Sequence, residues 1–123
     1  MKRDLDLIRT IMMYLEHNLE YGQNIDNNEL CRILQDEENS IKKVCYHLGL
    51  TREANWLTTN KSANNTTFMI MGITNDGHDF LDVIREQSTW EIIKSKAIKA
   101  GGYTLPMLVE FGLEYVKKMF LES

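Results

Sequence analysis

The segment from Tyr46 to Arg85 constrains the fold of this chain more than any other. It opens with the end of an amphipathic helix, continues as two strand-like stretches around a polar loop, and leads into another helix. The stretches Trp56–Thr59 and Phe68–Thr74 are rich in β-branched and aromatic residues. The polar loop between them, N-K-S-A-N-N-T-T, is too long for a tight turn. We therefore expect a β-hairpin with a loose tip, placed between two helices.

Two helices are expected before that segment. Residues 3–20 carry apolar side chains at every third or fourth position, which is the period of an amphipathic helix, and Gly22 ends this helix. Asp26-x-x-Glu29 has the pattern of a capping box and is expected to open a short second helix. The acidic residues 36–38 are expected to form the turn that follows it.

A third helix is expected to begin at Asn39 or Ser40 and to end at Asn55, where a left-handed residue is favoured. The spacing i, i+3, i+4, i+7 predicts a buried stripe made of Ile41, Val44, Cys45 and Leu48. The opposite, solvent-facing side is then expected to carry Lys43, Tyr46 and His47, with Lys42 on its flank.

Further helices are expected after the hairpin. Ser88-x-x-Glu91 has the pattern of a second capping box and predicts a helix over residues 90–100. Thr104 is expected to cap a last helix that reaches about Leu121.

Together these elements predict a mainly α-helical protein with a small β-hairpin, of the α+β class. Their order is that of a winged helix-turn-helix with a C-terminal helical extension. The 123 residues suit a single domain. Residues 1–86 would form the winged-helix core, and residues 87–123 the C-terminal helices available for dimerisation.

The net charge of −4 is an objection to DNA binding, because non-specific affinity comes from neutralising phosphates. The charge is uneven, however. Residues 39–73 are the clearly positive segment, since they set Lys42, Lys43, Arg52 and Lys61 against Glu53. A local basic patch on an acidic protein permits DNA binding without requiring it.

The third helix and the hairpin are the candidate DNA-binding elements, because a winged helix presents that helix to the major groove of double-stranded DNA. Its first turn can also hold a phosphate. The candidate contact residues are Asn39, Ser40, Lys42, Lys43, Tyr46, His47 and Lys61. The alternative is a protein–protein interaction module on the same scaffold, for which an exposed Leu50 would be a marker.

The sequence points to neither an enzyme nor a metalloprotein. Cys31, Cys45 and His47 lack the paired spacing of a zinc site, so two free thiols and no metal are expected. Glycine loops that cradle phosphates and nucleophile elbows are missing from the sequence. We therefore expect no cofactor, no small-molecule ligand and no catalytic residues.

The location expected from the sequence is the cytoplasm. No run of about 18 apolar residues is present, so no membrane span is expected. The opening M-K-R-D-L-D-L-I-R is charged throughout and has no apolar core of a signal peptide.

The last expected helix is apolar over most of its circumference, whereas one packing face needs only a narrow stripe. This surplus predicts a homodimer held mainly by residues 104–121. The expected interface residues are Leu108, Phe111, Tyr115, Met119 and Phe120. The alternative is that this helix lies across the first helix and the 90–100 helix of its own chain.

Several short motifs carry a resemblance to a known family. They are M-K-R-D-L-D-L-I-R at 1–9, Y-H-L at 46–48, I-T-N-D-G-H-D-F-L-D-V-I-R at 73–85 and K-A-G-G at 99–102. They resemble an uncharacterised family of small proteins from bacterial genomes and their prophages, a domain of unknown function. Y-H-L…E-A-N-W-L followed by I-T-x-x-G is also similar to the recognition helix and wing of winged-helix transcription regulators. The uncharacterised family has no established activity, so the resemblance implies the winged-helix fold more than a function. The function that we expect is that of a DNA-binding regulator of transcription, of a prophage type.

Overall fold

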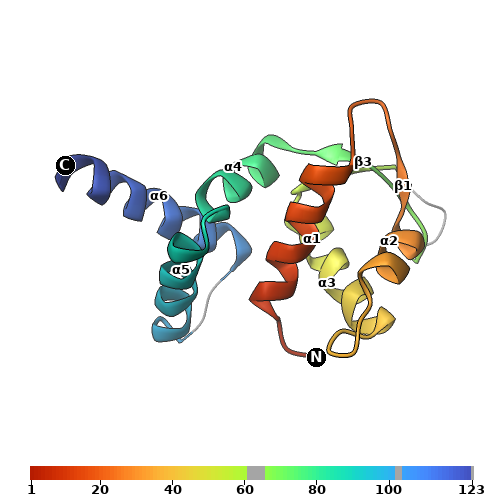
Figure 1. Ribbon diagram of the computed structural model, residues 1–123, viewed down its shortest axis with the longest axis horizontal. Coiled ribbons are helices and arrows are strands. Elements are labelled where there is room, and N and C mark those ends of the chain that lie inside the picture. The colour runs from red at the N-terminus through yellow and green to blue at the C-terminus, as the bar shows by residue number, and fades with distance from the viewer. Residues whose placement is uncertain (61–65, 102–103, 123) are drawn as a thin grey trace. The chain divides into compact units, whose positions relative to one another are not determined.

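The computed structural model describes residues 1–60, 66–101 and 104–122, and it falls into two compact units, residues 1–77 and 78–123 (Figure 1). The division lies within α4 (Asn75–Ile84), earlier in the chain than the boundary at residue 86 that the helix pattern suggested. Lys61 of the expected wing lies outside the described residues.

The first unit is three helices and a small antiparallel sheet. Its elements in chain order are α1 (Leu5–Asn18), β1 (Ile25–Asp26), α2 (Asn27–Leu34), α3 (Ile41–Glu53), β2 (Leu57–Thr59) and β3 (Met69–Ile73). The strands lie in the order β1-β3-β2. The prediction of a mainly helical α+β protein is confirmed. The strand β1 was not expected, because two residues are too few to show a periodic pattern.

The strand β3 is the centre of the sheet and pairs with both of its neighbours. Leu57 of β2 lies opposite Ile73, and Ile25 of β1 lies opposite Ile70. The pairing of β2 with β3 becomes irregular after Thr58. This hairpin is the one that the β-branched stretches predicted.

Three side chains set the helix boundaries in this unit. The carboxylate of Asp26 accepts hydrogen bonds from the backbone N–H groups of Asn28 and Glu29 and so opens α2. Ser40, and not Asn39, is the cap of α3. Asn55 ends that helix with a φ of 61°, in the left-handed region that asparagine tolerates. Each of these signals is local, and each was predicted.

The core of the first unit is built on one face of α1. The buried residues of that helix recur at helical spacing, and they are Leu5, Leu7, Ile8, Ile11, Met12 and Leu15. Val44 and Leu48 of α3, Trp56 and Ile70 are buried as well. In Figure 1, α1 and α3 lie side by side, in agreement with their contacts.

The second unit consists of most of α4, α5 (Gln87–Lys99) and α6 (Leu105–Glu122). Phe80 of α4 meets Trp90 of α5 edge to face at 6.1 Å between ring centroids. The expected capping box at Ser88 is wrong, because α5 already begins at Gln87 and Ser88 lies within its first turn. Glu86 precedes the helix without a capping side-chain hydrogen bond.

The residues expected at a dimer interface are spread around α6. Leu108 is fully buried within the chain and is therefore not available to a second copy, which corrects that part of the prediction. The reason is that Leu108 shares one helix face with the buried Leu105 and Gly112. Phe111 and Tyr115 are half-buried. The exposed members of the set are Met119 and Phe120.

Gly112 marks a close approach of α6 to α4. A Cβ atom at this position would lie 2.6 Å from both Cβ and Cγ2 of Val83 and 3.1 Å from Cδ1 of Ile93. The first two distances are far below ordinary van der Waals contact, and neither Val83 atom can move away freely. Glycine at this position thus allows the two helices to pack.

We predict opposite effects when two helical glycines are replaced by alanine. Gly112→Ala forces α6 away from Val83 and should lower the free energy of unfolding by about 1–3 kcal/mol, as overpacking does. Gly49→Ala, in α3, meets nothing within 4 Å and should raise it by about 0.5–1 kcal/mol through helix propensity. Thermal unfolding followed by circular dichroism measures whether each variant is less or more stable than the wild type. Equal stabilisation by both variants would contradict the close approach.

Candidate nucleic-acid interface

The turn between α2 and α3 is fixed by its own side chains. The Asp36 carboxylate accepts hydrogen bonds from the backbone N–H groups of Glu38 (2.9 Å) and Asn39 (2.7 Å). One residue later, the Ser40 hydroxyl accepts from the N–H of Lys43 at 3.2 Å. The direction in which α3 leaves the turn is therefore set locally. Asn39 Oδ1 is buried and has no hydrogen-bond partner within the described part of the chain.

The outer face of α3 is narrower than the sequence suggested. Lys42, Tyr46 and Glu53 are exposed, and Gly49 between them is partly covered. Ile41, which was expected in the core, is 40% exposed. The buried residues of α3 are instead Val44, His47, Leu48 and Thr51. The prediction that His47 faces solvent is wrong, since its exposure is 0%.

His47 is buried because it joins α3 to the start of α1. Its Nε2 accepts a hydrogen bond from the backbone N–H of Asp4 at 2.7 Å. Its Nδ1 lies 2.8 Å from the carbonyl oxygen of Lys43. Because Nε2 accepts, the proton that completes the second bond must be on Nδ1, so these partners fit the neutral imidazole. The neighbouring Tyr46 ring packs edge-on against it.

Lys43 belongs to the same junction. Its ammonium lies 2.8 Å from Oδ2 of Asp4, and both side chains are about two-thirds buried or more, with exposures of 28% and 34%. Asp4 Oδ1 also accepts from the N–H of Leu7 and so caps α1. Burial alone would raise the pKa of Asp4, but the bonds from Lys43 and Leu7 and the nearby charge of Lys43 outweigh it and lower that pKa.

Arg52 holds the hairpin against α3. Its Nε donates to the hydroxyl of Thr59 at 3.1 Å and its Nη2 to the carbonyl of Asn60 at 3.3 Å. The guanidinium carbon lies 4.1 Å from the centre of the Phe68 ring, which is a cation–π contact. The side chain of Asn60 in turn accepts from the N–H of Met69. The guanidinium of Arg52 therefore has a structural role, because its contacts join α3 to the hairpin.

Asn27 is a structural residue that the sequence pattern did not reveal. Its Oδ1 accepts from the N–H of Phe68 at 2.9 Å, and its Nδ2 donates to the carbonyl of Thr66 at 3.1 Å. Its own backbone N–H bonds to the Phe68 carbonyl. The start of α2 is thereby attached to the strand that returns from the hairpin. An asparagine after a capping aspartate gives no sequence signal for a contact about forty residues away.

A groove of about 650 Å³ runs beside the outer face of α3. Its lining is mixed: Phe68, Gly49 and Cys45 contribute apolar surface, and Glu53, Arg52, Asn28 and Thr66 contribute polar groups.

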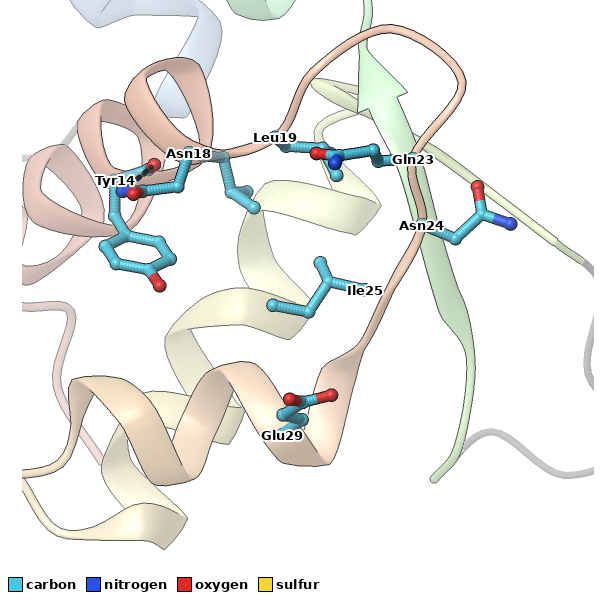
Figure 2. Close-up of a pocket in the computed structure, with 8 residues that line it drawn as sticks. Tyr14, Asn18, Leu19, Gln23, Asn24, Ile25 and Glu29 are labelled. Atoms are coloured by element: carbon cyan, nitrogen blue, oxygen red, sulfur yellow. Dashed lines mark hydrogen bonds between the residues drawn. The ribbon is translucent and has the colours of Figure 1, made fainter.

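A second hollow, of about 370 Å³, lies between α1 and β1 (Figure 2). Leu15, Leu19 and Ile25 give it an apolar lining, and Tyr14 and Glu29 add polar groups at its edge. The amide of Asn18 is already engaged, since it donates to the carbonyl of Tyr14 at 2.9 Å. Sequence reasoning pointed to neither of these hollows.

The two cysteines meet between α2 and α3. Their Sγ atoms are 2.7 Å apart, and both residues are free thiols. Burial, and then the contact with Cys45, raises the pKa of the Cys31 thiol well above its ordinary value. His47 points away to Asp4, so the structure does not bring the three residues together. Within residues 1–60, 66–101 and 104–122, no cluster of three metal-ligating side chains occurs.

The site and fold define a small, mainly helical protein that carries a three-stranded sheet and a capped helix, α3, with an exposed outer face. Residues 2–103 match the family described as hypothetical protein (DUF2513), and the chain belongs to that family. The expected membership of an uncharacterised family is thus confirmed. Comparison with curated proteins and with solved structures gave no significant match. None of the helices in the described residues is long and apolar enough to cross a membrane.

We predict that Asp4→Asn changes how stability depends on pH. Asparagine keeps the helix cap but cannot form the ion pair with Lys43. Because folding lowers the pKa of Asp4, the ionised carboxylate stabilises the folded state above the unfolded pKa of about 3.9. This contribution is lost as the pH falls through the lower, folded pKa. Its size should be about 1 kcal/mol or less, since the pair is partly solvated.

Urea unfolding at pH values from 7 to 2.5 provides the measurement. The difference between the wild type and Asp4→Asn should be constant at pH 5–7 and should shrink below about pH 4. A difference that grows with acid would contradict the assignment.

We also predict that Cys31 resists alkylation in the folded protein. The thiolate is the reactive form, and the raised pKa leaves almost none of it at pH 8. The Cys45→Ser variant isolates Cys31 and should react with iodoacetamide at least about a hundredfold more slowly when folded than in urea. Mass spectrometry of timed samples measures both rates. Equal rates would show that the thiol is accessible and ionised.

Proposed function

We propose that residues 1–77 form a winged helix-turn-helix that binds double-stranded DNA. In this proposal α2 and α3 are the helix-turn-helix, α3 is the recognition helix, and β2 and β3 with the loop between them are the wing. The protein would act as a regulator of transcription of the kind found in prophages.

The observation that carries the proposal is the exposed first half of α3. Ser40 caps this helix, Lys42 projects from its first turn, and Tyr46 follows one turn later with 43% of its surface exposed. A helix N-terminus with a neighbouring lysine is suited to a phosphate, and a tyrosine one turn along can reach a base edge.

The arrangement around α3 supports the same proposal. The sheet order β1-β3-β2 and the chain order α1-β1-α2-α3-β2-β3 are compatible with a winged helix and support the proposal. Arg52 fixes the hairpin beside α3, so a duplex in contact with Tyr46 would also be near the hairpin.

Little positive charge is left on the outer face of α3 for contact with phosphates. Two of the four basic residues in the positive segment 39–73 are used within the fold, because Lys43 is paired with Asp4 and Arg52 is bound to Thr59 and Asn60. Lys42 remains on the outer face. DNA binding by this unit should therefore depend only modestly on salt, with a slope of about −1 to −3 per copy in a plot of log K against log salt.

Because Lys43 and Arg52 are used within the fold, a second candidate function, a protein-interaction module, is also favoured. Glu53 and Tyr46 are both exposed on α3, and the adjoining groove of about 650 Å³ has both apolar and polar lining residues, Phe68 among them. Leu50, which was to mark such a surface, is only partly exposed. A peptide helix could occupy this groove without any phosphate contact.

We predict that Lys42→Glu weakens DNA binding about tenfold at roughly 100 mM salt and makes the salt slope shallower by about 1. Lys42 is a better test than Lys43, whose replacement would also break the ion pair with Asp4. The matched control is Lys99→Glu, an equal charge change at an exposed position of α5.

The duplex for this measurement comes from selection on a random DNA pool at two salt concentrations, followed by fluorescence anisotropy. Lys99→Glu should bind within about twofold of the wild type. If the pool yields no enriched sequence at low salt, or if both variants lose affinity equally, α3 is not a recognition helix and the interaction module becomes the better assignment.

A further inference from the structure

The second half of α6 presents apolar side chains that the described chain leaves uncovered. Leu113, Val116 and Met119 are each about half exposed, and Leu121 is 82% exposed. In the first half of the same helix, by contrast, Leu105 and Leu108 are buried. In Figure 1 the C-terminal turns of α6 extend past α5. An exposed apolar surface of this kind on one helix indicates a partner.

Charged residues are placed in a definite order along this surface. Within residues 110–121, Glu110 and Glu114 come first and Lys117 and Lys118 come last, and the exposed side chains of Leu113, Val116 and Phe120 lie among them. None of these four charged side chains makes a hydrogen bond or an ion pair within the described residues. The segment from residue 110 to residue 121 therefore has an acidic half and a basic half, and its four charged side chains have no partner among the described residues.

A segment with an acidic first half and a basic second half is complementary to itself when two copies run in opposite directions. We propose that the segment from Glu110 to Leu121 packs antiparallel against the same segment of a second copy of the chain. A two-fold axis near residues 115 and 116 then sets Glu114 of each copy opposite Lys117 of the other. Leu113, Val116 and Leu121 fill the space between the helices.

The opposite orientation is disfavoured by the same residues. In a parallel pair, Glu114 would face Glu114 and Lys117 would face Lys117, and like charges repel. The antiparallel pair also sets the dipole of each helix against that of the other. The charge pattern thus selects one arrangement.

The pair is short, which limits its strength. Twelve helical residues rise by roughly 18 Å, so the interface is smaller than the ~1,200 Å² of a standard stable complex. The dimer should therefore dissociate in the micromolar range, on the order of 1–100 µM.

This dimer differs from the one that the sequence predicted. Leu108 is excluded because it is buried within the chain, and Leu113, Val116 and Leu121 take its place. The surface also lies beyond residue 103, where the match to the family ends. It is independent of DNA binding by α3, although it would supply the second copy of α3 that paired half-sites require.

Reversing the charges of Glu114 and Lys117 by substitution tests the proposed dimer. Sedimentation velocity from 5 to 300 µM, without DNA, should show wild-type protein approaching twice the 14.4 kDa of one chain. Glu114→Lys alone and Lys117→Glu alone should each raise the dimer dissociation constant at least tenfold. An equal mixture of these two variants should restore the dimer, because both contacts then join opposite charges.

Two further variants complete the experiment. The double variant Glu114→Lys with Lys117→Glu, which has the composition of the wild type, should dimerise as the wild type does. Leu113→Glu should be monomeric, and circular dichroism checks that every variant is helical. A wild-type monomer at 300 µM, or a dimer that the single charge changes leave intact, overturns the proposal. Neither result bears on DNA binding by α3, which the measurement on Lys42→Glu tests separately.

Discussion

The first unit depends on one buried polar junction, in which His47 of α3 accepts a hydrogen bond from the backbone N–H of Asp4. A buried imidazole is costly unless both nitrogens have partners, and here the carbonyl of Lys43 is the second. The Asp4 carboxylate completes the junction by capping α1 and by pairing with Lys43. The beginning of the chain is thereby attached to α3, and the orientation of that helix about its own axis is set.

That orientation decides which side chains of α3 remain for function. With His47 and Lys43 turned inward and Arg52 holding the hairpin, the outer face keeps Lys42 and Tyr46. Positive charge that appeared available for phosphates is used to join elements of the fold. A protein that binds DNA with so few free cations would need contributions from backbone N–H groups and base contacts, and two copies acting together would bind more tightly than one.

The second unit combines close packing with an uncovered surface on the same helix. Gly112 lets the first half of α6 approach Val83 closely. The second half carries exposed Leu113 and Leu121. The surplus of apolar residues in this helix therefore divides between packing within the chain and the exposed surface that we propose for a second copy.

The sequence by itself determined the elements whose signals are local. Asp26, Ser40 and Asn55 act on backbone groups a few residues away, so the helix ends were predictable. The burial of His47 and the exposure of Ile41 were not, because the apolar stripe of a 13-residue helix tolerates a modest rotation about its axis. Only the tertiary structure decided that rotation, since the partner that draws the imidazole inward is a backbone N–H group 43 residues earlier in the chain.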